Sequence, residues 1–147
     1  QEEIALGLGD VLFEECKTEI DDFIAHGFED VAISFLTEQN GKGLLPYYYA
    51  PIRNYKVDNS KLGRSIELDG LAEGLGKNSN CLLVVECKYR KTPFSVAMLE
   101  QLKESVSIFG GYTTIDYYLF SKSGFTPEIM KLSDSSLHFI SLDSMFS

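Results

Sequence analysis

The sequence predicts a single α/β domain, with a mixed sheet of about four strands flanked by helices. Its 147 residues are a length typical of one compact domain. Apolar residues make up 44% of the chain and charged residues 24%, which is ordinary for a globular protein. Helical and strand patterns alternate, in the order helix, strand, strand, helix, strand, helix, strand. We therefore treat residues 1–147 as one domain without internal repeats.

Helical patterns occupy the first part of the chain. A leading helical segment, residues 1–16, is weakened by Gly7 and Gly9. A stronger helix is predicted over residues 17–38, where apolar residues recur at helical spacing. They are Ile20, Phe23, Ile24, Phe28, Val31, Ala32, Phe35 and Leu36. Because these side chains cover more than half of the helix circumference, we expect this helix to be packed on more than one side.

Four segments have the composition and spacing of β-strands. They are residues 66–72, 81–89, 112–121 and 137–142. Alternation along the first of them would put Asp69 on the face opposite to Leu68 and Gly70. The stretch from residue 44 to residue 65 is left open, because its prolines at positions 46 and 51 disfavour a central strand.

The clearest strand is the second one, which begins with an apolar run over residues 81–85. Such a run is typical of a central strand that is buried on both faces. After it, Ser95 is positioned as the N-cap of an amphipathic helix that continues to Phe109. Thr126, followed by Pro127, predicts the start of another helix. Strands and helices therefore alternate over the second half of the chain.

The charge restricts the partners that we expect. The chain has 13 basic and 22 acidic residues, a net charge of −9. Because the phosphates of nucleic acids repel such a chain, it is a poor general binder of DNA or RNA. No apolar run reaches the roughly 18 residues of a membrane helix, so no membrane partner is expected. Three cysteines, an odd number without metal-binding spacing, favour a reduced, cytoplasmic protein.

Chemically informative residues stand at the end of the central strand. Glu86 and Lys88 lie two residues apart, so their side chains emerge on one face directly after the apolar run. Asp69 precedes them, in a strand that can pair as a hairpin and bring the two carboxylates together. Two carboxylates are suited to hold Mg²⁺, which activates water and neutralises phosphate charge. A neighbouring lysine can orient that water or stabilise developing negative charge.

Asp69, together with the triplet Glu-Cys-Lys at 86–88, resembles the signature of the PD-(D/E)XK nuclease superfamily. That signature is an acidic residue on one strand and (D/E)-X-K on the next, and its literal Pro-Asp pair is absent here. The resemblance implies a restriction-endonuclease-like fold and metal-dependent hydrolysis of phosphodiesters. It implies Mg²⁺ or Mn²⁺ held by Asp69 and Glu86, with Lys88 in catalysis. The superfamily often adds a glutamate on a preceding helix, and Glu29 is our candidate, both as a metal ligand and as a catalytic residue.

A closer resemblance links the chain to the nuclease-like C-terminal domains of archaeal-type AAA+ ATPases. It rests on the order and spacing of four segments, residues 23–30, 63–69, 85–89 and 118–125. In that family a P-loop ATPase module and a winged-helix module come first, so the resemblance implies that this chain is the C-terminal part of a longer protein. ATP would then be bound only by the absent N-terminal module. Contact with DNA would be made through the full-length protein.

Two functional alternatives stay open. One is an active Mg²⁺-dependent nuclease module. The other is a catalytically degenerate module that binds to or regulates the ATPase, and the negative charge favours it. The remaining polar residues near these motifs are expected to be solvated or to contribute little: Arg64, Glu67, Glu73, Arg90, Lys91 and Gln101.

Overall fold

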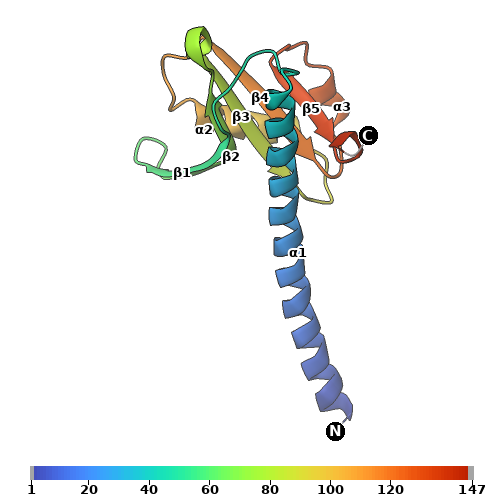
Figure 1. Ribbon diagram of the computed structural model, residues 1–147. Coiled ribbons are helices and arrows are strands. Elements are labelled where there is room, and N and C mark those ends of the chain that lie inside the picture. Colours follow the sequence, from blue (N-terminus) through green and yellow to red (C-terminus); the bar gives the residue numbers. More distant parts are fainter. Residues whose placement is uncertain (1, 146–147) are drawn as a thin grey trace.

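A computed structural model describes residues 2–145 of the chain and, within that range, the side chains of residues 19–145. Five strands form one mixed sheet, and helices lie on both of its faces (Figure 1). The predicted fold class is confirmed, with one strand more than expected. No helix in the described part of the chain has both the length and the apolar content of a membrane span.

The five strands are hydrogen-bonded in chain order. They are β1 (Arg53–Asn59), β2 (Arg64–Glu73), β3 (Cys81–Lys88), β4 (Thr114–Ser121) and β5 (Leu137–Ser141). β2 is antiparallel to both of its neighbours, whereas β3, β4 and β5 run parallel. β3 is therefore the central strand, and the two parallel connections beyond it pass through helices.

β1 is the strand that the sequence did not predict. It lies at the edge of the sheet, and its two apolar residues, Tyr55 and Val57, are partly buried against the core. The two prolines precede it, in the segment that leads from the first helix to the sheet. An edge strand needs few apolar side chains, which explains why its signal in the sequence is weak.

Helix α1 (Glu2–Gly41) is continuous, whereas the sequence predicted two helices. Gly7 and Gly9 do not interrupt it, because a glycine inside a helix costs only about 1 kcal/mol and this stretch contains no proline. The C-terminal part of α1 packs against the sheet, and its N-terminal half projects beyond the sheet (Figure 1). The described part of the leading segment, residues 2–16, thus belongs to the outer part of one long helix.

The expectation that this helix is packed on more than one side is wrong for its outer turns. Phe28, Ala32 and Leu36 are buried against the sheet. By contrast, Ile20 and Phe23 are exposed. One stripe of α1 is therefore covered by the domain, while another apolar stripe is in contact with solvent.

The helices that follow begin at the predicted caps. Ser95 Oγ accepts a hydrogen bond of 3.3 Å from the backbone N–H of Met98 at the start of α2 (Val96–Val106). Thr126 caps α3 (Pro127–Met130) in the same way. Both predicted helix starts are confirmed. Two short 3₁₀ helices complete the described chain, η1 (Gly76–Asn78) and η2 (Asp143–Met145).

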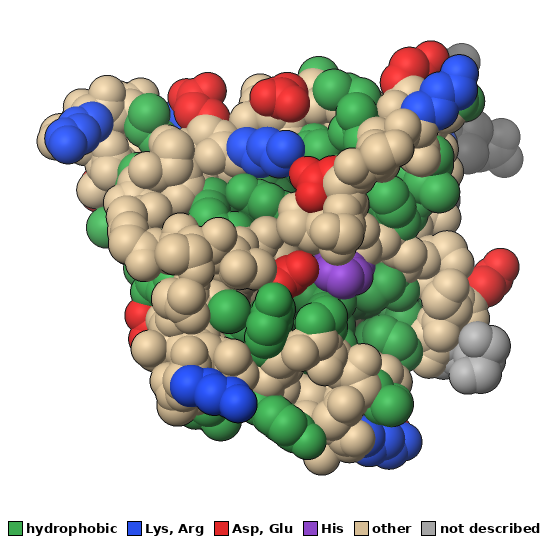
Figure 2. All heavy atoms as spheres, turned by 90° about the horizontal axis from the view of Figure 1, so that it is seen from above, with side chains coloured by type: hydrophobic (Ala, Val, Ile, Leu, Met, Phe, Trp, Pro, Cys, Tyr) green, Lys and Arg blue, Asp and Glu red, His purple; other side chains and the backbone are tan. Residues whose placement is uncertain are grey.

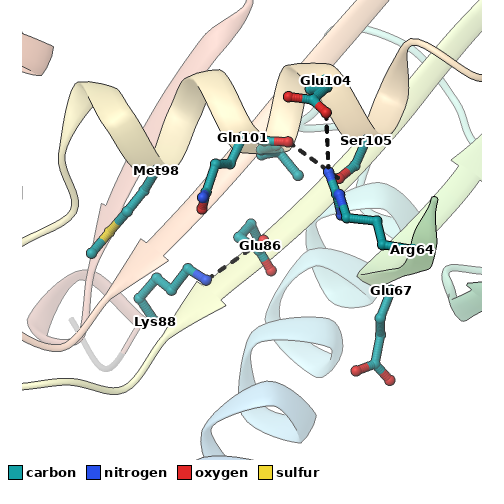
Figure 3. A pocket seen from close by; sticks show the side chains of 9 residues that line it. Arg64, Glu67, Glu86, Lys88, Met98, Gln101, Glu104 and Ser105 are labelled. Carbon is teal, nitrogen blue, oxygen red and sulfur yellow. Dashed lines mark hydrogen bonds and ion pairs between the residues drawn. The ribbon is translucent and has the colours of Figure 1, made fainter. Parts of the chain in front are cut away.

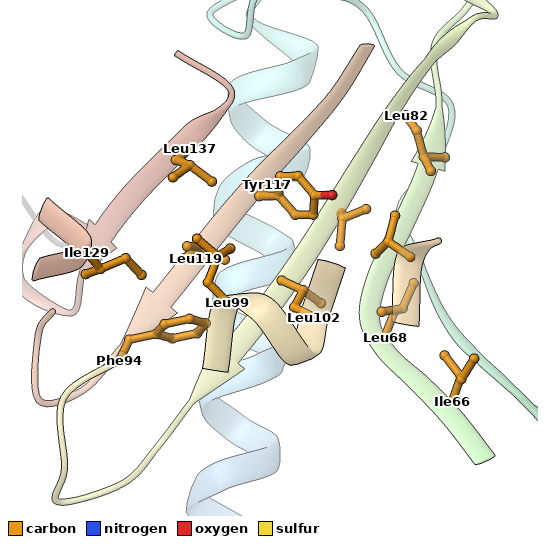
Figure 4. Close-up of a cluster of buried hydrophobic side chains, with 12 residues drawn as sticks. Ile66, Leu68, Leu82, Phe94, Leu99, Leu102, Tyr117, Leu119, Ile129 and Leu137 are labelled. Atoms are coloured by element: carbon orange, nitrogen blue, oxygen red, sulfur yellow. The ribbon is translucent and has the colours of Figure 1, made fainter. Parts of the chain in front are cut away.

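Two hydrophobic clusters hold the sheet between its helices, and β3 contributes to both. Leu82 and Val84 face α2, while Leu83 and Val85 face α1. This confirms that the apolar run is buried on both faces. Figure 4 shows the cluster on the α2 side, where side chains from the sheet and from α2 pack together. The same alternation carries Glu86 to the α2 face of the sheet.

A β-bulge interrupts the regular alternation of β2. In the pairing with β1, two residues of β2, Asp69 and Gly70, stand opposite the single residue Asn54. Leu68 and Leu71 consequently pack against the same α2-side cluster, although they are three residues apart. The prediction that Gly70 shares a face with Leu68 is therefore wrong, because the bulge turns Gly70 toward α1.

Gly70 suits this bulge because it has no side chain. A Cβ at this position would lie only 2.8 Å from side-chain atoms of Ile33, Ile52 and Val85. The helix α1, the segment before β1 and the central strand therefore all approach the backbone of β2 closely here. This packing fixes the backbone next to Asp69.

Candidate functional site

The candidate site lies where β2 separates from β3. The antiparallel pairing of the two strands extends to Gly70 opposite Val85. Asp69 and Glu86 come next on the two strands, beyond this last pair. The hairpin that the sequence predicted thus brings the two residues to the same point, and the bulge sets the direction of Asp69 there.

Asp69 connects the acidic residues of the site. Its Oδ2 atom accepts a hydrogen bond of 2.7 Å from the backbone N–H of Cys87. The carboxyl groups of Glu86 and Glu29 also lie near the Asp69 carboxylate, whose charge raises the pKa of both. Asp69 therefore brings together three acidic side chains from three elements, β2, β3 and α1.

Glu86 is mostly buried and lies beside another acid. Its side chain is 16% exposed. Burial, followed by the hydrogen bond to Asp69 and the charge of Asp69, raises the pKa of Glu86 to about 9. The ammonium group of Lys88 lowers this pKa but does not compensate for the other effects. The pair of Glu86 and Asp69 therefore holds a proton near neutral pH.

Lys88 lies on the same face as Glu86, as the spacing predicted. Its Nζ atom is 3.8 Å from Oε2 of Glu86, and its side chain is 21% exposed. Between them, Cys87 packs its side chain on the opposite face, against the α1-side cluster. Burial raises the pKa of the Cys87 thiol. The cysteine therefore contributes its backbone N–H to the site, and its thiol belongs to the core.

Glu29 brings α1 into the site. Its side chain is 32% exposed and turns toward the sheet, as expected. Its Oε2 atom lies 3.7 Å from Nδ1 of His26, one helical turn earlier. Burial, followed by the charge of Asp69, raises the pKa of the Glu29 carboxyl group. The three acids predicted from the sequence therefore lie together in the structure.

A polar cavity of about 450 Å³ opens over Glu86 and Lys88 on the α2 side of the sheet (Figure 3). Helix α2 forms its opposite wall with Gln101 and Ser105, and Arg64 of β2 lines it as well. In Figure 3, Lys88 and Gln101 point toward the space next to Glu86. The lysine and the glutamate that the sequence singled out are therefore open to a ligand.

A second cavity, of about 350 Å³, reaches Asp69 from the α1 side. Glu29 and Ile33 of α1 line it, together with Ile52 and Asn54. Asp69 therefore belongs to the hollow on one side of the sheet, and its partner Glu86 to the hollow on the other side. The separation of β2 from β3 leaves the acid pair between these two cavities.

Two residues that line this cavity, Arg64 and Gln101, were expected from the sequence to contribute little. Arg64 donates a hydrogen bond of 3.0 Å from Nη2 to Oγ of Ser105, and the same atom lies 3.8 Å from Oε1 of Glu104. Gln101 lies one helical turn before Ser105. Residues three and four apart are neighbours on a helix, so the sequence could have shown that Gln101 and Ser105 share one face of α2. The contact of this face with Arg64 joins distant parts of the sequence, and no local pattern predicts it.

The other polar residues named in the sequence are exposed, and the charge of one of them, Glu67, also raises the pKa of Glu29. Glu73 stands near the other end of β2, where it accepts a hydrogen bond from the hydroxyl of Tyr112. Glu67 is exposed at the rim of the larger cavity. Arg90 and Lys91 are exposed in the loop after β3. Their expected position at the surface is confirmed.

The donor set of the acid cluster fits a hard divalent cation. Among the side chains of residues 19–145, no three His, Cys, Asp or Glu residues already form a group that could hold a metal ion. The raised pKa of Glu86 instead favours a proton on this acid pair. Carboxylate oxygens are the ligands that Mg²⁺ and Mn²⁺ prefer, and such ions compete with protons for them. Asp69, Glu86 and Glu29 are the residues that would hold the ion.

The net charge of −9 is unevenly distributed. Residues 2–41, which form α1, contain eleven acidic residues and one lysine, a net charge of −10. The rest of the chain carries twelve basic and eleven acidic residues, a net charge of +1. On the face seen in Figure 2, Lys and Arg side chains are interspersed with Asp and Glu. The repulsion of nucleic acid expected from the whole-chain charge is therefore concentrated on one helix.

A comparison with protein families finds one match. The model of DUF234, described as archaea bacterial proteins of unknown function, matches residues 1–104. The matched part covers α1 to most of α2, and it contains Glu29, Asp69, Glu86 and Lys88. No curated protein and no solved structure matches the chain significantly. All residues of the acid cluster and Lys88 therefore lie in the part that the family shares.

Proposed function

The chain belongs to the DUF234 family of archaeal and bacterial proteins, and we propose that it is a metal-dependent nuclease module that hydrolyses phosphodiester bonds of DNA. One observation carries this proposal: the carboxyl groups of Asp69 and Glu86 lie next to each other where β2 separates from β3, and Lys88 Nζ lies 3.8 Å from Oε2 of Glu86. Two acids in contact oppose folding unless a proton or a cation compensates for their charge. Such a pair is therefore suited to a cation.

The proposed roles follow from the positions of the side chains. Asp69 and Glu86 would hold the ion, with Glu29 assisting from α1. The ion, when bound, polarises the phosphate and lowers the pKa of a coordinated water. Lys88 has its ammonium group next to Glu86, where it can orient a water or stabilise negative charge that develops on the phosphate. The backbone N–H of Cys87 holds Asp69 in place.

The walls of the larger cavity suit a phosphodiester. Arg64 and Lys88 line it on different sides of Glu86 (Figure 3). Ser105 and Glu104 restrain the guanidinium of Arg64. These two positive groups can contact phosphate oxygens, and a bound cation would offset the charge of the three acids that line the same cavity, Glu67, Glu86 and Glu104. The charge of +1 outside α1 is compatible with this contact.

The resemblance to the C-terminal domains of AAA+ ATPases extends the proposal to a longer protein. In it, a preceding P-loop module would bind ATP, and the domain described here would bind none. Much of the affinity for DNA would come from the other modules, including the winged-helix module. We expect ATP binding by the full-length protein and none by residues 1–147, which equilibrium dialysis with labelled ATP measures.

Cleavage of labelled nucleic acids tests the nuclease. The full-length protein and residues 1–147 are incubated with single- and double-stranded DNA and with RNA, in Mg²⁺, in Mn²⁺ or in EDTA. We expect metal-dependent cleavage of DNA that Lys88→Met abolishes. Lys91→Met, at an exposed lysine three residues away, is the matched control and should cleave like wild type. Equal cleavage by wild type and Lys88→Met would show that the activity does not belong to this site.

A catalytically degenerate module that binds to or regulates the ATPase is the second candidate. The charge of α1 favours it, because an acidic helix is better suited to protein contacts than to nucleic acid. This function predicts that removal of the domain changes the ATPase rate of the full-length protein, without any metal-dependent cleavage. An unchanged ATPase rate, together with metal-dependent cleavage, would exclude it.

A further inference from the structure

Helix α1 has an apolar stripe that the rest of the domain does not cover. Phe23 is 78% exposed and Ile20 56%, and Ile24 and Val31 are also exposed. We call these four residues the outer stripe. They lie one or two helical turns apart, so they share one side of α1. A cluster of large exposed apolar side chains is unfavourable in water and marks a contact surface.

The outer stripe continues into an apolar groove of about 420 Å³. Phe23, Ile24 and Val31 line the groove on α1, and Tyr89 and Leu142 line it from the ends of β3 and β5. Such a groove has room for one or two apolar side chains of a partner. Docking of an amphipathic helix into an apolar groove is a common way to recognise a protein segment.

Acidic side chains surround the outer stripe. Glu19, Asp21 and Asp30 are exposed and lie on the two sides of the stripe. The whole helix has a net charge of −10. A partner that covers the outer stripe must therefore bring positive charge as well as apolar side chains.

The charge also decides between classes of partner. A second copy of the chain would place two helices of charge −10 side by side, and like charges at this density oppose pairing. Anionic membrane surfaces and nucleic acids are repelled for the same reason. A basic protein segment is attracted, and its apolar side can fill the groove.

We propose that the outer stripe and its groove bind a basic amphipathic helix of a partner protein. Apolar side chains of that helix cover Phe23 and Ile24, and its lysines or arginines pair with Asp21 on one side of the stripe and with Glu19 or Asp30 on the other. This interaction is independent of the proposed nuclease, because it uses neither Asp69 nor the cavity beside α2.

The test uses a fluorescent helical peptide of lysine and leucine, with its leucines at spacings of three and four residues. Its affinity for the protein is measured by fluorescence anisotropy at low and at high salt. In one control peptide serine replaces leucine, and in another glutamate replaces lysine. The variant Phe23→Ser removes the most exposed side chain of the stripe. Leu75→Ser is the matched control, since Leu75 is an exposed apolar residue that does not line the groove.

We expect Phe23→Ser to raise the Kd at least about tenfold, and Leu75→Ser to leave it unchanged. The serine and glutamate peptides should bind at least about tenfold more weakly than the parent peptide. Circular dichroism confirms that each variant is folded before its affinity is used.

Several outcomes would overturn the proposal. Equal affinity for wild type and Phe23→Ser, or for the leucine and serine peptides, would reduce the binding to unspecific charge attraction. A dimer in sedimentation experiments that Phe23→Ser dissociates would identify a second copy as the occupant. Binding to phosphatidylglycerol vesicles that Phe23→Ser abolishes would identify a membrane surface instead.

Discussion

Two buried acids on neighbouring strands of the sheet have opposite surroundings. Asp116 of β4 is 4% exposed and accepts a hydrogen bond of 3.2 Å from the hydroxyl of Tyr49. Its other oxygen lies 3.1 Å from Nε2 of His138. Glu86 of β3 instead contacts the carboxylate of Asp69. One acid is surrounded by groups that can donate hydrogen bonds, and the other is placed beside further acids.

This difference separates an acid that serves the fold from one that suits a ligand. The partners of Asp116 satisfy its oxygens and connect β4 to β5 and to the segment before β1, so nothing further is needed there. Glu86 borders a cavity, and its acidic neighbours disfavour its charged form. A fold gains no stability from such an arrangement. A strongly shifted acid next to a specific partner in a cavity is typical of functional sites.

The largest expected effect is on catalysis. Glu86→Gln removes one proposed metal ligand while keeping the size of the side chain, so cleavage of DNA should fall at least about 10²-fold. Steady-state rates with Mg²⁺ and Mn²⁺ measure the effect. Glu100→Gln, at an exposed glutamate of α2, should cleave at the wild-type rate. A wild-type rate for Glu86→Gln would remove Glu86 from the mechanism.

The second largest expected effect is on the stability of the fold, to which Asp116 contributes. Asp116→Ala leaves the buried hydroxyl of Tyr49 and the ring of His138 without their partner, which should lower the free energy of unfolding by about 2 kcal/mol. Urea denaturation measures this loss. Glu86→Gln in metal-free buffer should be at least as stable as wild type, because glutamine keeps a neutral side chain beside Asp69 and has no charged form to bury. Equal losses in the two variants would contradict the distinction between the two acids.

The third expected effect is a pH dependence of stability without metal. The pKa of Glu86 is about 9 in the folded protein, against an ordinary value of 4.5. Between these values the folded chain keeps a proton that the unfolded chain has lost. The free energy of unfolding contributed by Glu86 should therefore fall as the pH rises from about 4.5 to about 9. Thermal melts in EDTA should show this slope, and Glu86→Gln should flatten it. If the variant kept the same slope, the pH dependence of stability would have to come from groups other than Glu86.

The smallest expected effect comes from one hydrogen bond. Tyr49→Phe removes the donor to Asp116 and keeps the ring, so the free energy of unfolding should fall by about 1 kcal/mol. The activity on DNA should stay at the wild-type level. A loss of cleavage in this variant, at full stability, would mean that the Asp116 cluster takes part in the reaction.

Local signals predicted those parts of the molecule that depend on near neighbours in the chain. The apolar run of β3 and the caps at Ser95 and Thr126 were confirmed, because each involves residues only a few positions apart. The common face of Glu86 and Lys88 followed from the period of two along a strand.

Features that depend on packing between distant segments were not predicted. The bulge at Gly70 arises where α1, the segment before β1 and β3 meet, and alternation along one strand contains no information on it. The pair of Asp116 and His138 forms only when β4 and β5 lie side by side. The position of Glu29 beside Asp69 was expected from a family resemblance, since periodicity indicated only the side of the helix.

Binding of Mn²⁺, measured by isothermal titration calorimetry, tests the central claim most directly. The claim is that Asp69 and Glu86 form a cation site. Wild type should bind one ion, and Asp69→Asn and Glu86→Gln should each weaken binding at least about tenfold, while Glu100→Gln leaves it unchanged. No binding by wild type, or equal affinity in Glu86→Gln, would contradict the claim.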